Sequence, residues 1–172
     1  MKLLKTLNPQ NATPEEFNKY AAREASRAIV IDEDNNIAIL HVRNEKYYKL
    51  PGGGIEKDED KEIALKRECL EEIGCEIEVI DEIGIIVEHR KMFELNQTSY
   101  CYLAKIKGEK GTPQFTKEEI AEGFEQLWVP YDKALSLISN NIAHGLEGHS
   151  YIVPRDTFFL KEAEQKLKKI LI

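Results

Sequence analysis

The sequence has few cysteines and no long apolar run. Its three cysteines are odd in number and include no Cys-x-x-Cys pair, so we expect reduced, buried thiols rather than a disulfide framework. No segment approaches the roughly 20 apolar residues that a membrane-spanning helix needs. The N-terminal segment also lacks the sustained apolar stretch of a signal peptide. These absences predict a cytoplasmic protein with no membrane partner.

The sequence also has no excess of positive charge. It carries 24 Lys and Arg against 31 Asp and Glu, for a formal net charge of -7. Because proteins neutralise nucleic-acid backbones with Lys and Arg, nucleic acid is not an expected partner. A small nucleotide remains compatible with an acidic protein, since a bound metal ion reverses the local charge. At 172 residues, we expect one domain covering the whole chain.

Strand and helix patterns are mixed along the chain without regular alternation. Strands are expected near 25–31, 37–43, 47–50, 76–88, 99–106 and 124–129, and helices near 14–20, 60–73, 131–139 and 156–171. This order favours an α/β (α+β) fold with a mixed sheet flanked by helices over a doubly wound parallel sheet.

The segment from Gly53 to Cys75, GGIEKDEDKEIALKRECLEEIGC, concentrates carboxylates on one helix. At about 100° per residue, Glu68, Glu71 and Glu72 fall within one sector of that helix. Hard oxygen ligands at this density suit Mg²⁺ or Mn²⁺, which pair a few carboxylates with substrate phosphates. The alternative is a solvated acidic face, the usual fate of a charge run.

The same helix should bury an apolar stripe. Ile63, Leu70 and Ile73 are expected on the side opposite the carboxylates, facing the core.

Seven positions of this segment have a fixed spacing that resembles the signature of the Nudix hydrolase superfamily. That signature is a glycine, five residues, a glutamate, seven residues, and then Arg-Glu-apolar-x-Glu-Glu-x-Gly-apolar. The two apolar positions hold Cys69 and Cys75, which can behave as small buried apolar residues. All seven polar or glycine positions match: Gly53, Glu59, Arg67, Glu68, Glu71, Glu72 and Gly74.

The resemblance implies roles for these residues and an α/β/α sandwich with a mixed sheet. It covers about 25–138, with segment 1–20 and the helix at 156–171 as additions. The carboxylates of Glu68, Glu71 and Glu72 and the carbonyl of Gly53 match metal ligands, for Mg²⁺ or Mn²⁺. Arg67 and Glu59 match a structural ion pair, and Gly74 the end of the helix.

A catalytic base is implied but not fixed by the resemblance. Either Glu71 or Glu72 could take the proton of the attacking water. Some family members use a more distant glutamate instead, and Glu118, Glu119, Glu122 and Glu125 lie in a suitable segment. We favour Glu119 and Glu122. The alternative is a capped helix, because Thr116 followed by Glu119 has the spacing of a capping box.

Substrate contacts must come from outside the signature. Arg27 and Arg43 could reach a phosphate, and Tyr48 could stack on a base. Each also has an ordinary explanation, as a surface arginine or a strand tyrosine that packs. The His89-Arg90-Lys91 cluster is expected in a loop, either near the site or simply in solvent.

The resemblance implies hydrolysis of a nucleoside diphosphate linked to another group X, with a small nucleotide as partner. In size the chain resembles the mutator-type nucleoside triphosphate pyrophosphatases. The alternatives are a non-catalytic nucleotide sensor and a hydrolase of ADP-ribose, nucleotide sugars or RNA 5′ ends. Many small enzymes of the family are dimers, so the expected assembly is either a monomer or a homodimer.

Overall fold

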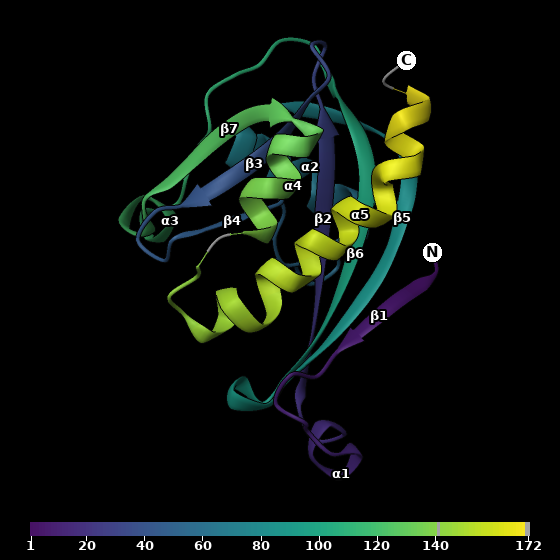
Figure 1. Ribbon diagram of the computed structural model, residues 1–172, viewed down its shortest axis with the longest axis vertical. Coiled ribbons are helices and arrows are strands. Elements are labelled where there is room, and N and C mark those ends of the chain that lie inside the picture. The colour runs from purple at the N-terminus through teal and green to yellow at the C-terminus, as the bar shows by residue number, and fades with distance from the viewer. Residues whose placement is uncertain (141, 171–172) are drawn as a thin grey trace.

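A mixed sheet of seven strands forms the centre of the protein (Figure 1). The computed structural model describes residues 1–140 and 142–170. The strands are β1 (Leu3–Leu7), β2 (Ala21–Ile31), β3 (Asn36–Val42), β4 (Tyr47–Lys49), β5 (Glu76–Arg90), β6 (Leu95–Lys107) and β7 (Phe124–Pro130). Their order is β1-β5-β6-β2-β3-β4, and β7 pairs with β3.

The sheet contains both parallel and antiparallel pairs, which confirms the predicted mixed sheet. β2 runs parallel to β6 over its whole length, from Ala21 opposite Leu95 to Ile31 opposite Lys105. β5 and β6 are antiparallel, whereas β1 runs parallel to β5. β3 is antiparallel to β2, β4 and β7.

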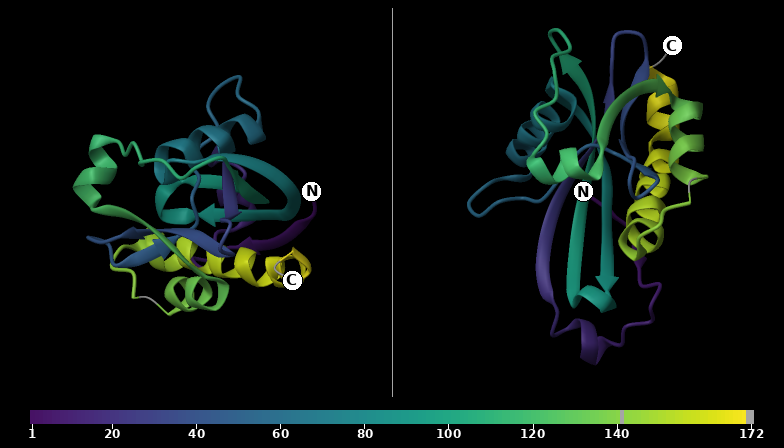
Figure 2. Two further views of the ribbon diagram at one scale, coloured as in Figure 1. Left: turned by 90° about the horizontal axis from the view of Figure 1, so that it is seen from above. Right: turned by 90° about the vertical axis from the view of Figure 1, so that its left-hand side faces the viewer.

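Helices cover both faces of the sheet. They are α1 (Pro14–Phe17), α2 (Lys61–Ile73), α3 (Lys117–Glu122), α4 (Tyr131–Ser139) and α5 (Val153–Ile170), with a 3₁₀ turn at Lys91–Phe93 and a π turn at Gly148–Ile152. The two further views place α2 on one face and α4 with α5 on the other (Figure 2). This is the sandwich expected from the sequence.

Two apolar clusters hold these layers together. One contains Leu65, Cys69 and Ile73 of α2, packed against buried residues of β2, β3 and β6. The other contains Phe159 and Leu160 of α5 and packs against the opposite face of the sheet. All three cysteines are free and buried, as expected.

The buried face of α2 differs from the predicted one. Ile73 is fully buried, but the prediction was wrong for Ile63 and Leu70, whose exposed fractions are 56% and 47%. The side chains that α2 buries are Ala64, Leu65, Cys69, Glu72 and Ile73. The sector of α2 that carries the carboxylates therefore overlaps the edge of the core instead of lying opposite to it, and Glu72 is buried.

The boundaries of α2 follow its capping residues. The Asp60 side chain accepts hydrogen bonds from the backbone N–H groups of Glu62 and Ile63 at the first turn. Gly74 ends the helix in a left-handed conformation with φ +65°. A Cβ at Gly74 would lie 2.6 Å from the backbone carbonyl carbon of Gly111, so only glycine fits.

Strand β1 was not predicted. It lies beside β5 at Gly84, where the pairing of β5 with β6 has a register irregularity. A Cβ at Gly84 would lie 2.5 Å from the side chain of Leu4, so the glycine makes room for β1. A five-residue strand with an exposed face has little periodicity of its own, which explains why no strand was predicted there.

The C-terminal helix begins earlier than predicted. It was expected over 156–171, but α5 starts at Val153; Leu171 lies outside the described residues. Phe159, Leu160 and Ala163 of α5 are fully buried against the sheet. None of the helices in the described part of the chain is long and apolar enough to cross a membrane.

The corrected face of α2 makes a prediction about stability. Leu65→Ala should lower the free energy of unfolding by about 2–5 kcal/mol, because it leaves a cavity in the core. Leu70→Ala removes the same atoms from a half-exposed position and should change it by less than about 1 kcal/mol. Urea denaturation of both variants provides the measurement. Equal losses would contradict the placement of Leu70 outside the core.

Candidate active site

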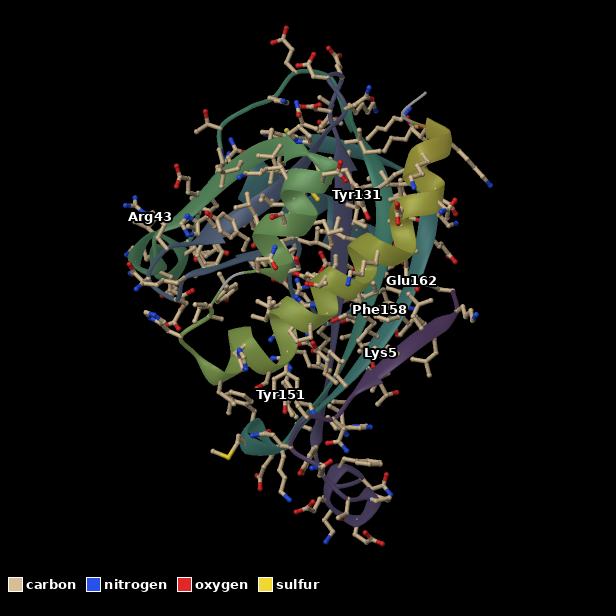
Figure 3. All side chains as sticks on the ribbon, viewed as in Figure 1. Lys5, Arg43, Tyr131, Tyr151, Phe158 and Glu162 are labelled. Carbon is tan, nitrogen blue, oxygen red and sulfur yellow. The ribbon has the colours of Figure 1, made fainter. Side chains whose placement is uncertain are left out.

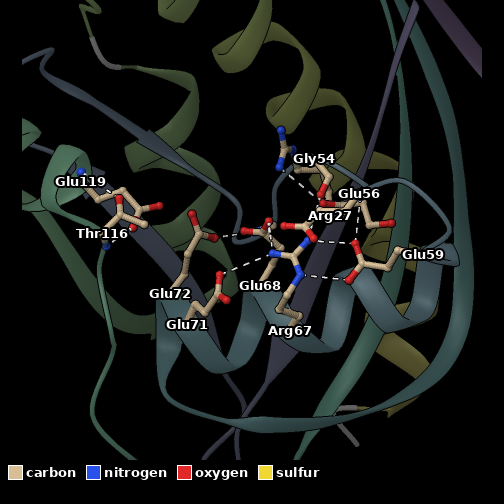
Figure 4. A network of polar contacts seen from close by, with 12 residues as sticks. Arg27, Gly54, Glu56, Glu59, Arg67, Glu68, Glu71, Glu72, Thr116 and Glu119 are labelled. Atoms are coloured by element: carbon tan, nitrogen blue, oxygen red, sulfur yellow. Dashed lines mark hydrogen bonds and ion pairs between the residues drawn. The ribbon is translucent and has the colours of Figure 1, made fainter.

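The Arg67 side chain is the centre of a polar network on α2 (Figure 4). Its Nε and Nη2 donate to the two carboxylate oxygens of Glu59, each at 2.9 Å. Nη2 also donates to the carbonyl of Gly54 at 3.0 Å. Nη1 donates to Glu68 at 2.8 Å and to Glu71 at 3.4 Å. One guanidinium thus ties the glycine loop, Gly52 to Gly54, to α2. The network includes the expected pair between Arg67 and Glu59.

Glu72 is the buried carboxylate of the set, with an exposed fraction of 1%. Its two oxygens accept hydrogen bonds from Lys49 Nζ at 2.8 Å and from the backbone N–H of Gly52 at 2.6 Å. Burial raises the pKa of Glu72, while the Lys49 charge acts in the opposite direction. Both oxygens have a partner, as a buried carboxylate requires.

The glycine loop is pressed against its neighbours. Gly52 has φ +126°, and a Cβ there would lie 2.1 Å from the carbonyl oxygen of Ser26. A Cβ on Gly53 would lie 2.3 Å from a carboxylate oxygen of Glu68. The Gly53 carbonyl accepts a hydrogen bond from the Ser26 N–H at 3.0 Å. The loop therefore needs glycine at both positions to let β2 and Glu68 approach.

The donor set here fits a hard divalent cation in its chemistry. Glu68, Glu71 and Glu72 offer carboxylate oxygens, and Gly53 offers a carbonyl with a second lone pair. Within residues 1–140 and 142–170, no three Asp, Glu, His or Cys side chains already converge at ligand spacing. Glu68 is turned to Arg67 and Glu72 to Lys49. A cation would have to compete with these internal charges for the oxygens.

A cleft of about 290 Å³ opens beside these carboxylates. Its acidic lining comes from Glu68, Glu72, Glu119, Glu122 and Glu147, and its basic lining from Arg23, Arg27, Lys49, Arg90 and Arg155. A more open hollow of about 600 Å³ lies over the first turn of α2 and is lined by Glu59 but by none of the three expected metal-binding carboxylates. The chemistry therefore points to the smaller cleft.

The distal glutamates separate into two groups. Glu119 and Glu122 line the cleft, whereas Glu125 faces His41 at 3.9 Å on the far side of β7. Glu119 also forms the capping box with Thr116, so both interpretations of this segment apply at once. Burial raises the pKa of Glu71, and the negative charges of Glu68 and Glu119 contribute to that shift.

Of the three proposed substrate contacts, only Arg27 lines the cleft. Arg43 is exposed and lies at the outer end of the β3–β4 hairpin, next to α3 (Figure 3). Tyr48 stacks on His41 with ring centroids 4.2 Å apart and packs against the core under α4 and α5. Because side chains alternate along a strand, Tyr47 and Lys49 of β4 face the cleft instead.

The predictions from the sequence missed or misplaced several residues in and around the cleft. Arg90 was expected in a loop, but it ends β5 and is 2% exposed. Lys49 was not singled out, although alternation along 47–50 could have found it. Arg155 and Asp156 are two charges inside the apolar run YIVPRDTFFL, and that contrast was the available signal. Both are fully or almost fully buried on α5.

Comparison with known proteins gives a family match over most of the chain. The profile of the NUDIX domain matches residues 22–148. No curated protein matched the sequence.

Solved structures share the fold at low sequence identity. A NUDIX hydrolase from Nitrosomonas europaea has a TM-score of 0.63 at 13% identity, covering 85% of this chain and 90% of its own. A MutT protein from Methanosarcina mazei Go1 has 0.59 at 15%, covering 87% and 98%. An ADP-ribose pyrophosphatase from Streptococcus suis has 0.53 at 17%, covering 83% and 92%. At these identities the likeness supports the fold alone.

Removing the central arginine should destabilise the protein. Arg67→Ala leaves the carboxylates of Glu59 and Glu68 without their main partner, and we expect a loss of about 1–3 kcal/mol in the free energy of unfolding. The matched control is Lys66→Ala, because Lys66 is half exposed and its one ion pair among the described residues is with Glu62 at 3.7 Å. Thermal denaturation at neutral pH provides the measurement, and an unchanged melting temperature would contradict the central role of Arg67.

The loss of stability in Arg67→Ala should also depend on pH. Hydrogen bonds from Arg67 hold the pKa of Glu59 below its ordinary value of 4.5. A carboxyl group whose pKa is lowered in the folded state stabilises the fold at pH values above its unfolded-state pKa. This stabilisation is lost as the pH falls through the folded-state pKa. The stability difference between wild type and Arg67→Ala should therefore be full at neutral pH and shrink in acid. A difference that grows in acid would contradict this assignment.

Proposed function

The chain belongs to the Nudix family, and we propose that this Nudix hydrolase uses Mg²⁺, or Mn²⁺ in its place, to cleave the pyrophosphate bond of a nucleoside diphosphate linked to another group. The observation that carries this proposal is the cleft in which two of the three signature carboxylates, Glu68 and Glu72, meet a basic wall. Acidic and basic groups on facing walls suit a substrate whose phosphates need both a cation and arginines.

Four residues would hold the metal. They are Glu68, Glu71 and Glu72 with their carboxylates, and Gly53 with its carbonyl oxygen. When bound, the cation neutralises phosphate charge and polarises the attacking water. Three of these residues project from α2 and one from the loop that Arg67 ties to it, so the ligands belong to one rigid unit.

The remaining residues either hold the site in position or accept the proton of the attacking water. Arg67 fixes the helix to the loop, and Lys49 orients the Glu72 carboxylate and opposes the rise in its pKa that burial causes. We propose Glu119 or Glu122 as the group that accepts the proton of the attacking water, because both line the cleft opposite α2. Glu71, whose pKa is raised by burial and by neighbouring carboxylates, is the alternative base on the helix itself.

The proposed substrate is a nucleoside triphosphate or a related nucleotide. The similarity to an ADP-ribose pyrophosphatase keeps ADP-ribose as the competing substrate. A panel of nucleoside triphosphates, ADP-ribose, nucleotide sugars, dinucleoside polyphosphates and 5′-triphosphate RNA, assayed for phosphate and pyrophosphate release with Mg²⁺ and Mn²⁺, tests the proposal. Binding without turnover on every member would contradict it and favour a nucleotide sensor.

The carboxylates on α2 give the next prediction. Glu72→Gln keeps the shape but removes the charge and one of the two acceptor oxygens that serve Lys49 and Gly52, so turnover should fall by about 100-fold or more. Glu71→Gln should have a similar effect. The matched control is Glu62→Gln on the same helix, where the side chain is about half exposed and, within the described part of the chain, forms an ion pair with Lys66 alone. Initial rates across a Mg²⁺ titration give the measurement.

Full activity in Glu72→Gln at saturating Mg²⁺ would remove that residue from the metal site. Equal losses in Glu62→Gln would show instead that the whole helix surface acts through its net charge.

The distal base is tested separately. Glu119→Gln preserves the capping box, since glutamine at the third helical position accepts the same backbone hydrogen bond. It should lower kcat by about 100-fold and flatten the acidic limb of the pH–rate profile, because the base no longer titrates. Glu118→Gln, one residue earlier and exposed, is the control. An unchanged kcat in Glu119→Gln would transfer the role to Glu122 or Glu71.

A further inference from the structure

The wall of the cleft away from α2 contains three buried arginines from separate elements. Arg27 lies on β2, Arg90 at the end of β5 and Arg155 on α5. Their exposed fractions are 7%, 2% and 1%. Side chains of this type are almost never buried unless they are paired, so the partners of each one matter.

Two of the three arginines are compensated by carboxylates. Arg90 pairs with Glu88 at 2.8 Å and with Glu147 at 2.5 Å. Arg155 pairs with Asp156 at 2.7 Å and lies 3.6 Å from Glu88. These contacts fix the two guanidinium groups in place but do not use all of their donors.

Arg27 is different because it has no carboxylate partner among the described residues. Its guanidinium donates one hydrogen bond, from Nη1 to the carbonyl of Ser26 at 3.4 Å. Its backbone lies against the glycine loop, since a Cβ on Gly52 would be 3.0 Å from the Arg27 Cα. A positive charge with no carboxylate in direct contact is therefore next to the loop whose N–H holds Glu72.

Unpaired polar atoms gather at the same place. In the described part of the chain, six buried side-chain nitrogen or oxygen atoms have no hydrogen-bond partner. Five of them belong to this wall or to the carboxylate behind it: Arg27 Nε, Arg155 Nη1 and Nη2, Glu88 Oε1 and Gln97 Oε1. Arg155 Nη1 and Glu88 Oε1 face each other as an ion pair at 3.6 Å, which leaves Arg27 Nε, Arg155 Nη2 and Gln97 Oε1 without any partner among the described residues. Because buried polar atoms are nearly always hydrogen-bonded, this group indicates a place for a polar ligand. The two free donors lie on cationic side chains and favour an anionic one.

We propose that Arg27 and Arg155 bind a phosphate of the substrate that lies beyond the two phosphates joined by the cleaved bond. This inference rests on the proposed function and adds to it a choice of substrate class. The phosphate is either the third phosphate of a nucleoside triphosphate or one carried by the X group. A nucleoside diphosphate joined to an uncharged sugar leaves the arginine wall unmatched.

The size of the cleft supports the same choice. Its volume of about 290 Å³ lies at the lower end of the range for small-molecule sites. That space suits a phosphate chain, with the nucleoside extending outward, better than a complete nucleotide sugar. Guanidinium groups match phosphate oxygens in pairs, which gives selectivity for a phosphate over a neutral hydroxylated ring.

Calorimetric binding with Mg²⁺ and non-hydrolysable α,β-methylene analogues tests this proposal. The probes are the analogues of ATP, of ADP-ribose, and of ADP-ribose with a phosphate on its terminal ribose. We expect wild type to bind the ATP analogue at least about tenfold more tightly than the ADP-ribose analogue. Equal or better binding of the phosphorylated ADP-ribose analogue would assign the site to a phosphate on X.

Arg27→Gln should weaken binding of the ATP analogue by about tenfold and of the ADP-ribose analogue by less than twofold. Arg43→Gln removes an exposed arginine outside the cleft and should change neither. Arg27→Lys keeps the charge without the planar fork and should give an intermediate loss, which preserves the test if the glutamine variant folds poorly. In turnover, Arg27→Gln should raise KM for the triphosphate more than it lowers kcat.

Equal affinity of wild type for the ATP and ADP-ribose analogues would overturn the proposal, as would an equal loss for both in Arg27→Gln. Failure of the proposed function has a different result, namely no metal-dependent turnover on any substrate while the preference among the analogues persists. The experiments therefore distinguish failure of the proposed phosphate site from failure of the proposed function.

Discussion

The rest of the site depends on the five-donor guanidinium of Arg67. It joins the glycine loop to α2 by binding Glu59, the carbonyl of Gly54 and Glu68 at 2.8–3.0 Å. Lysine has three donors on a point charge and could not satisfy this set in one plane. Without such a centre, the carboxylates of α2 would repel one another at the edge of the core. The network thus lets the helix carry a charge density that a cation can use.

Electrostatic compensation continues beyond Arg67 into the interior. Glu72 is held by Lys49, and the opposite wall contains Arg90 and Arg155 with their own carboxylates. Buried ion pairs often contribute little net stability, because desolvation offsets their attraction. A wall with several buried ion pairs and with unpaired hydrogen-bond donors is therefore less stabilising than apolar side chains of similar volume would be. Ligand binding is the physical reason we assign to that cost.

Local rules account for most of what the sequence predicted. Capping residues and glycine marked the ends of α2, and the fixed spacing identified Arg67 with Glu59. The error at Ile63 and Leu70 arose because a helical wheel gives relative angles but not which sector meets the sheet. The basic wall could not be predicted, since Arg27 and Arg155 are 128 positions apart in the sequence and meet only through tertiary packing. Long-range placement of charges was the missing information.

The C-terminal helix shows how an element outside the signature becomes part of the site. Asp156 of α5 accepts a hydrogen bond from the backbone N–H of Leu50 at 2.8 Å, and Leu50 leads directly into the glycine loop. The neighbouring Arg155 is held by the same carboxylate at 2.7 Å. One buried aspartate therefore sets both the position of the loop beside the proposed metal ligands and the position of an arginine on the opposite wall. Any displacement of α5 must move both walls together, so the helix acts as a structural link between the two ends of the cleft.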